Sequence, residues 1–267
     1  MQGNLITAFI LTALAGLSTG VGSVIAFFAK KTNAKFLSVS LGFSAGVMIY
    51  VSMIEIFGKA QTSLQAAMGE KKGMIVTVAA FFAGMLLIGV IDRLIPKQDN
   101  PHEFQQPGMD TAASSGKSKL MRTGLFTALA IAIHNFPEGL ATFVSALQEP
   151  SLAIPIVVAI AIHNIPEGIA VSVPIYYASG DRKKAFLYSF ASGLSEPIGA
   201  VIGYLLLMPL MNNVMYGVLF AGVAGIMVFI SLDELLPSAR EYGEHHLSIY
   251  GLVAGMAVMA VSLLLFM

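Results

Sequence analysis

The chain has 267 residues, of which 56% are hydrophobic and only 11% are charged, and its mean hydropathy is +0.79. Soluble domains carry roughly 25% charged residues, so this composition excludes a water-soluble globule, and the apolar content excludes a disordered chain. The formal net charge is zero, which excludes the basic surface that a nucleic-acid partner requires. Cysteine is absent, and this excludes disulfides, thiolate metal sites and cysteine nucleophiles.

Apolar stretches longer than about 18 residues mark segments that can cross a bilayer. We predict an all-α integral membrane protein, because helices satisfy their own backbone groups in lipid. Breaking the chain at its polar clusters gives eight transmembrane helices, at 4–28, 36–57, 73–95, 121–147, 152–178, 184–211, 214–237 and 248–267. Residues 1–267 then form a single transmembrane domain of the cytoplasmic (cell) membrane, with a cytoplasmic loop at about 96–120.

The basic residues orient these spans, because Lys and Arg are enriched in cytoplasmic loops. With the first residues outside, the outward loops hold three basic residues, namely Lys59, Lys71 and Lys72. The inward loops and their flanks hold twelve: Lys30, Lys31, Lys35, Arg93, Lys97, Lys117, Lys119, Arg122, Arg182, Lys183, Lys184 and Arg240. This imbalance predicts that both termini lie outside.

Three pairs of segments resemble each other within the chain: 134–139 (HNFPEG) with 163–168 (HNIPEG), 45–55 with 224–234, and 16–25 with 193–202. Residues at matching places in a pair are called repeat partners below. The second pair matches the second span with the seventh, and the third pair matches the first span with the sixth. The two segments are separated by nearly the same number of residues in both pairs. Partners that are five spans apart cross the bilayer in opposite directions. The pattern is a 3+2+3 inverted-repeat arrangement, typical of secondary transporters with a site near the bilayer midplane.

The two HNxPEG motifs place ionisable groups near the middle of the fourth and fifth spans, and Glu196 lies near the middle of the sixth. A carboxylate buried at this depth costs several kcal/mol unless it is paired, hydrated or bound to a metal. In each motif His and Glu are four residues apart and share one helix face, with Asn beside them. Proline frees carbonyls of the preceding turn, and the glycine after each Glu allows close helix approach.

These polar groups are two imidazoles, two amides and three carboxylates, a set that can bind one or two divalent cations: His134, Asn135, Glu138, His163, Asn164, Glu167 and Glu196. Imidazole suits borderline ions and carboxylate suits harder ones, so Zn²⁺, Fe²⁺, Mn²⁺, Co²⁺ and Cd²⁺ are the candidates. These three spans have no Lys or Arg in their interiors, so a metal or protons must balance the carboxylates. The alternative interpretation is that Asn and His only join helices by hydrogen bonds.

Four further acids lie nearer the membrane faces: Glu55 toward the outer end of the second span, Asp92 toward the inner end of the third, and Asp233 and Glu234 toward the inner end of the seventh. We predict that they mark a transport path for a cation that moves inward. The alternative is that they are solvated helix ends.

The paired HNFPEG and HNIPEG motifs, the eight spans and the Ser195-Glu196-Pro197 element closely resemble the ZIP (zinc/iron-regulated transporter-like) family, and within it a bacterial branch of zinc transporters. The resemblance implies a binuclear metal site, with one metal held by His134, Glu138, His163 and Glu167. The adjoining metal would be held by Asn135, Asn164, Glu167 and Glu196, with Glu167 and Glu138 as candidate bridges. It also implies homodimers and an elevator-like movement of spans 1, 4, 5 and 6 against spans 2, 3, 7 and 8.

The leading hypothesis is therefore a divalent metal cation transporter that imports zinc by alternating access, with no enzyme activity and no cofactor apart from the transported metal. One alternative is an intramembrane metal-dependent hydrolase, since a metal can activate water. The motifs read HNxPE instead of HExxH, which counts against it. A divalent cation channel is the other alternative.

Overall fold

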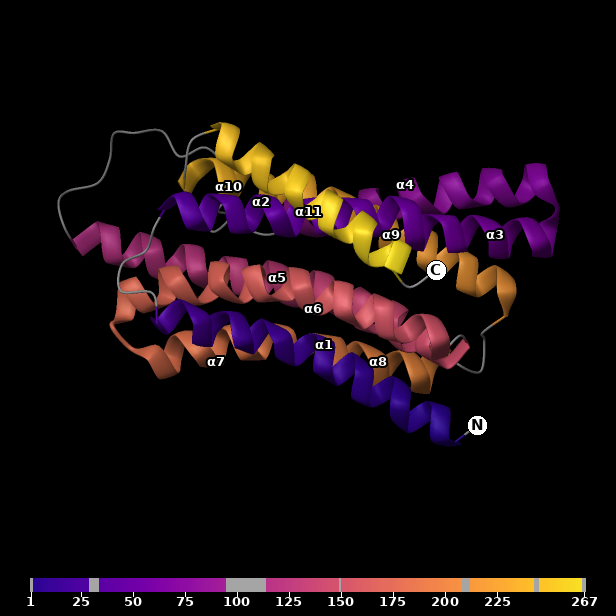
Figure 1. Ribbon diagram of the computed structural model, residues 1–267, viewed down its shortest axis with the longest axis horizontal. Helices are drawn as coiled ribbons and strands as arrows, with labels where there is room; N and C mark the ends of the chain where they lie inside the picture. The colour runs from indigo at the N-terminus through magenta and orange to yellow at the C-terminus, as the bar shows by residue number, and fades with distance from the viewer. Residues whose placement is uncertain are drawn as a thin grey trace.

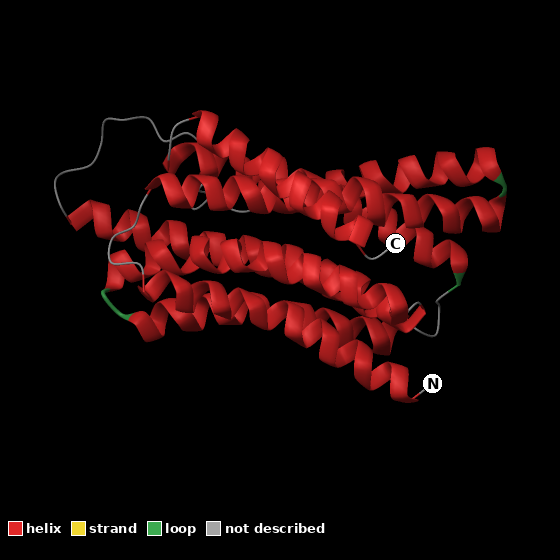
Figure 2. Ribbon diagram, viewed as in Figure 1, coloured by secondary structure: helices red, strands yellow, loops and turns green. Residues whose placement is uncertain are grey.

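The computed structural model describes residues 2–28, 34–94, 114–148, 150–207, 212–242 and 245–265. All regular structure among them is helical, which confirms the predicted all-α class (Figure 2). The elements in chain order are α1 (Gln2–Phe28), α2 (Ala34–Tyr50), η1 (Val51–Ile56), α3 (Phe57–Met68), α4 (Glu70–Leu94), α5 (Ser114–Gln148), α6 (Pro150–Ser179), α7 (Arg182–Gly193), α8 (Ser195–Leu207), α9 (Asn213–Ile230), η3 (Ser231–Leu235), α10 (Leu236–Tyr242) and α11 (His245–Leu265).

Six helical segments of this described part are long and apolar enough to cross a membrane: Leu5–Ile25, Ser38–Met68, Glu70–Arg93, Arg182–Leu206, Asn213–Arg240 and His246–Leu265. They correspond to six of the spans expected from the sequence. The other two expected spans, 121–147 and 152–178, lie within the long helices α5 and α6.

Two connections differ from the expectation. The loop expected at 96–120 falls outside the described residues as far as 113, whereas its remainder belongs to α5. The outward loop expected after residue 57 is a helical hairpin instead, because α3 continues to Met68. Ala60 and Leu64 bury one face of α3 against α9, and this contact stabilises a segment whose polar residues suggest a loop. Gly69 then turns the chain with a φ of +84°.

The helices form two bundles that lie one above the other in Figure 1. One bundle contains α1 and α5 to α8, and the other contains α2 to α4 and α9 to α11. The most extensive contacts lie within the bundles, between α2 and α11, α1 and α6, α5 and α6, and α4 and α9. The bundles touch mainly through α2 against α6, with smaller contacts of α9 with α5 and of α11 with α6.

Glycines allow the closest helix contacts, as the sequence predicts for Gly139 and Gly168. A Cβ at Gly168 would collide with the backbone carbonyl oxygen of Thr19, and a Cβ at Gly139 would collide with that of Glu196. Thr19 and Glu196 are themselves repeat partners. The same backbone contact thus occurs once between α6 and α1 and once between α5 and α8.

The second bundle has the same duplication. A Cβ at Gly46 would collide with the carbonyl oxygen of Leu252, and a Cβ at Gly225 would collide with that of Phe81. Gly46 and Gly225 are repeat partners as well. Close packing of α2 on α11 therefore matches close packing of α9 on α4.

Two π-helical turns occupy nearly corresponding places in these repeats. The segment η1 joins α2 to α3, and η3 joins α9 to α10. Such turns insert an extra residue into the helix and occur frequently at functional sites. Here η1 contains Glu55, and η3 contains Asp233 and Glu234.

Candidate metal centre

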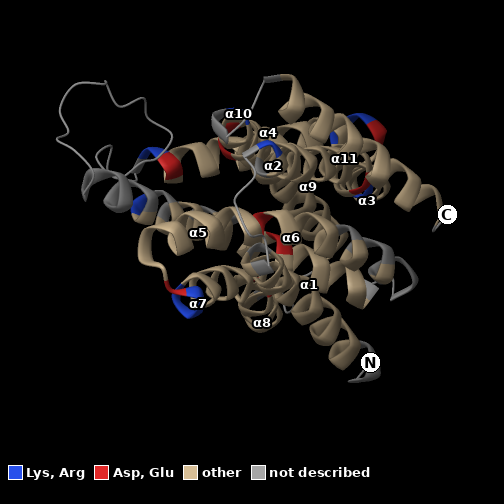
Figure 3. Cartoon of the chain, turned by 60° about the vertical axis from the view of Figure 1, so that its left-hand side comes forward, with Lys and Arg blue, Asp and Glu red and all other residues tan. Residues whose placement is uncertain are grey.

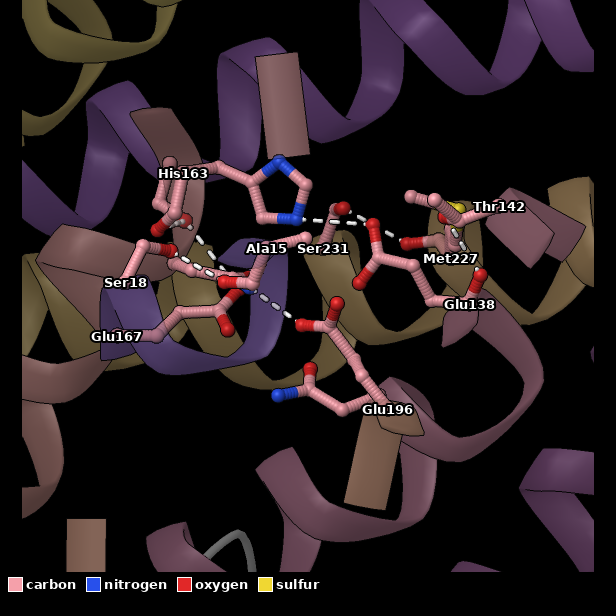
Figure 4. Close-up of polar contacts among 12 residues, drawn as sticks. Ala15, Ser18, Glu138, Thr142, His163, Glu167, Glu196, Met227 and Ser231 are labelled. Carbon is pink, nitrogen blue, oxygen red and sulfur yellow. Dashed lines mark hydrogen bonds and ion pairs between the residues drawn. The ribbon is translucent and has the colours of Figure 1, made fainter. Parts of the chain in front are cut away.

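The two motifs lie on neighbouring helices, and their side chains meet inside the bundle. The Glu138 side chain from α5 and the His163 side chain from α6 are buried, and His163 Nε2 lies 3.0 Å from Glu138 Oε1. Both helices continue through the prolines of their motifs, Pro137 and Pro166. An imidazole therefore faces a carboxylate at the centre of the bundle, as Figure 4 shows.

The second polar contact joins α6, α8 and α1. Asn164 donates a hydrogen bond through Nδ2 to Glu196 Oε1, and the same amide lies 3.0 Å from the carbonyl oxygen of Ala15. Glu196 lies in the first turn of α8, directly after the helix is interrupted at Leu194. A single turn residue, Leu194, thus separates α7 from α8 within the candidate span Arg182–Leu206, and Pro197 lacks the N–H that would bond to the turn before it.

Two further residues of the predicted set belong to the same region. Glu167 is fully buried, and its Oε1 lies 3.4 Å from Ser44 Oγ on α2. Asn135 is also fully buried, and its Nδ2 lies 3.5 Å from the carbonyl oxygen of Ser192. Figure 4 shows the carboxylates of Glu138, Glu167 and Glu196 directed toward one region.

Four buried oxygens at this centre have no hydrogen-bond partner among the described residues: Asn135 Oδ1, Glu138 Oε2, Asn164 Oδ1 and Glu196 Oε2. An unsatisfied buried polar atom costs about 1–3 kcal/mol, and more when it is charged. Carboxylate and amide oxygens are metal ligands, and a bound cation would satisfy several of them at once.

The balance of buried charge also favours a bound cation at this centre. Glu138, Glu167 and Glu196 are buried, whereas none of the described Lys and Arg side chains is. Figure 3 shows acidic residues beside α6 in the middle of the molecule. A positive charge from outside the chain would therefore stabilise the centre.

The predicted ligand set is only partly visible in the structure. His134 lies on α5, but its side chain is outside the described part of the chain. Among the described side chains, no group of three or more His, Asp or Glu converges as a metal site. The observed donors are instead the His163–Glu138 pair, two amides and two more carboxylates, so the ligand set stays a prediction.

Three of the four predicted path residues line one pocket beside η3. Its lining residues are Ile88, Ile91, Asp92, Ile133, Phe229, Ile230, Asp233 and Glu234. Ile133 directly precedes His134, so the pocket reaches the helix that carries the first motif. The acids from α4 and η3 therefore line a pocket beside the turn of α5 that leads into the first motif.

Glu55 does not join this group. Its Oε1 lies 2.9 Å from Lys59 Nζ, one turn further along the chain. The spacing of four residues would have indicated this ion pair from the sequence. Ser44 and the carbonyl groups of Ala15 and Ser192 were not predicted, because no motif in the sequence marks them.

These features define a multi-pass membrane protein with a buried acidic centre suited to a cation. A family model described as ZIP Zinc transporter matches residues 94–263. The chain belongs to the ZIP zinc transporter family, which confirms the resemblance of its motifs.

Full-length relatives support the bacterial branch that the motifs predict. The chain is 69% identical to zinc transporter ZupT of Streptococcus mutans over 266 residues, which covers 100% of both chains. It is 65% identical to zinc transporter ZupT of Clostridium perfringens, over 99% of this chain and 98% of the relative. The corresponding identity to zinc transporter ZupT of Oceanobacillus iheyensis is 64%, over 98% of each chain.

Proposed function

We propose that this protein of the cell membrane imports zinc into the cytoplasm by alternating access around the buried centre. The observation that carries the proposal is the set of buried, unpartnered oxygens beside the His163–Glu138 pair. Zinc binds imidazole and carboxylate ligands, and both are present. The chain has no cysteine thiolate, so the centre lacks a soft ligand that would retain zinc strongly.

The metal is cargo in this proposal, and two ions share the centre. One ion binds His134, Glu138, His163 and Glu167, and its neighbour binds Asn135, Asn164, Glu167 and Glu196. The contacts of His163 with Glu138 and of Asn164 with Glu196 support this division. Fe²⁺, Mn²⁺, Co²⁺ and Cd²⁺ use similar ligands, so we expect them to compete with zinc.

The proposed topology is one transmembrane domain of eight spans in a 3+2+3 inverted repeat, with both termini outside. The first residues of α1 and the last residues of α11 lie toward the same end of the molecule (Figure 1). The duplicated glycine contacts and the matching π-helical turns support the repeat. The excess of Lys and Arg in the opposite loops supports the orientation.

The proposed path runs from an outer mouth near Glu55, through the centre, to the pocket of Asp92, Asp233 and Glu234. Alternating access would move the bundle of α1 and α5 to α8 against the other bundle. The limited contact between the bundles supports this division, since less packing resists their relative movement. We further propose that two copies of the chain assemble as a homodimer, which cross-linking in native membranes would detect.

Zinc uptake into proteoliposomes tests the proposal, with an internal zinc dye as the reporter. We expect saturable uptake by the wild type and a loss of at least about tenfold in Glu167→Gln, because a ligand is removed. The matched control is Glu70→Gln, which removes the same charge from an exposed helix start. Uptake that does not saturate would favour a channel, and equal rates in all three proteins would contradict the site.

A further inference from the structure

Ser44 links the two bundles at the proposed metal centre. It is fully buried on α2, and its Oγ lies 3.2 Å from the carbonyl oxygen of His163 and 3.4 Å from Glu167 Oε1. Both acceptors belong to α6, within the motif HNIPEG. The hydroxyl therefore touches a predicted metal ligand and the backbone of another.

A serine hydroxyl has one hydrogen, so it donates to one of these acceptors at a time. The presence of two acceptors means that Ser44 can leave Glu167 without becoming an unsatisfied buried donor. Ser44 then no longer occupies Glu167 Oε1 and donates to the carbonyl of His163 instead. In both arrangements the hydroxyl holds α2 against α6.

The matching contact in the other half of the repeat, between α9 and α5, has no equivalent of Ser44. Ser44 directly precedes the repeated segment of α2, and the residue in the same place on α9 is Val223, which is buried and has no hydroxyl. The partner of Glu167 is Glu138 on α5. At the position of Val223, the contact of α9 with α5 therefore has no side-chain hydrogen-bond donor.

We propose that Ser44 is a positioning residue that orients Glu167 and, through this bond, stabilises the transporter state in which α2 and α6 are closed on each other. The inference rests on the proposed function. Movement of one bundle against the other separates the Ser44 hydroxyl from α6, and Val223 offers no matching bond in the opposite state. The equilibrium between the two states is thus biased by one side chain.

The absence of cysteine allows a direct test, because single cysteines can be introduced without other changes. Met48 and Met227 are repeat partners, and both are fully buried. We would measure the reaction rate of Met48→Cys and of Met227→Cys with a small thiol reagent in proteoliposomes without zinc. Each reporter is combined with Ser44→Ala, which removes the hydroxyl and little volume.

We expect Ser44→Ala to accelerate labelling at position 48 about 2- to 10-fold, the factor that corresponds to one buried hydrogen bond, with little change at position 227. Ser44→Thr retains a hydroxyl and should restore the slow rate. The control is Ser172→Ala, since Ser172 is also buried but donates to Ile169 within its own helix. It should leave both reporters unchanged.

An unchanged rate at position 48 in Ser44→Ala would overturn the proposal. So would equal acceleration at both reporters, or the same effect from Ser172→Ala, because each would indicate general loosening. The labelling experiment contains no zinc, so a negative labelling result would not count against the proposed import of zinc. Failure of wild-type uptake would instead overturn the proposed function and leave the labelling result standing.

Discussion

The contact of α2 with α6 and the contact of α9 with α5 join helices that carry matching segments of the repeat, but their side chains differ. On the first side, Ser44 bonds to α6, and Glu55 of η1 is paired with Lys59. On the second side, Val223 takes the place of Ser44, and η3 contributes Asp233 and Glu234 to a pocket. The first contact involves more residues than the second, although both are smaller than the main contacts within the bundles.

The two halves of the repeat therefore share their helix packing and differ in their charged groups. The close glycine contacts within the bundles and the π-helical turns occur in both halves of the repeat, because they set how the helices pack. The charged groups are unequal: Glu196 corresponds to Thr19, and Asp233 corresponds to Ile54. The repeat thus preserves the packing of the helices, whereas the charged groups differ between its halves.

The largest expected effect concerns the histidines of the two motifs. His134→Ala and His163→Ala should each reduce zinc uptake at least about tenfold, because each removes a predicted metal ligand. Uptake by proteoliposomes at equal protein content is the measurement. If only one of the two variants lost zinc uptake, the two motifs would not contribute equally to the metal centre.

The glycine contacts give the next effect, on stability. Gly139→Val and Gly168→Val should each lower the free energy of unfolding by about 1–3 kcal/mol, because each side chain would collide with a backbone carbonyl. The unfolding midpoint in detergent is the measurement. Gly58→Ala is the control, since nothing lies within 4 Å of a Cβ at this helical position. Effects no larger than that of the control would contradict the close packing.

The acids of the two π-helical turns test the direction of the path. Neutralising Asp233 and Glu234 together, as Asn and Gln, should reduce uptake about three- to tenfold, since it removes two carboxylates from the pocket through which the proposed path runs. Glu55→Gln should have a smaller effect, because it removes one carboxylate, which pairs with Lys59 and lies outside that pocket. Initial uptake rates at low zinc provide the comparison, and a larger loss in Glu55→Gln would reverse the proposed asymmetry.

The smallest effect is expected from Lys59→Ser. When the repeat is extended by a few residues, Lys59 matches Ser238, so this substitution makes the two halves of the repeat alike at this position. The Lys59–Glu55 pair is partly exposed, and pairs of this kind contribute about 0.2–1 kcal/mol. Uptake should therefore change by less than about fivefold. A complete loss of uptake would assign Lys59 a role in transport that the ion pair does not explain.

Hydropathy was sufficient to predict the helical class and most helix positions, because apolar length is what the bilayer selects. The spacing within HNFPEG and HNIPEG likewise predicted that Glu138 and His163 lie in the interior. The continuation of α3 to Met68 could not be predicted, since it depends on the burial of Leu64 against α9. The bond from Ser44 to α6 depends in the same way on tertiary packing between distant segments.

The most direct test of the central claim is anomalous scattering at the zinc edge from crystals grown with zinc. We predict a peak among Glu138, His163, Asn164, Glu167 and Glu196, at about 2.0–2.2 Å from ligand nitrogen or oxygen atoms. A second peak beside it would support the binuclear division. Well-occupied zinc elsewhere, with no peak at this centre, would contradict the claim that its buried oxygens exist to hold a metal.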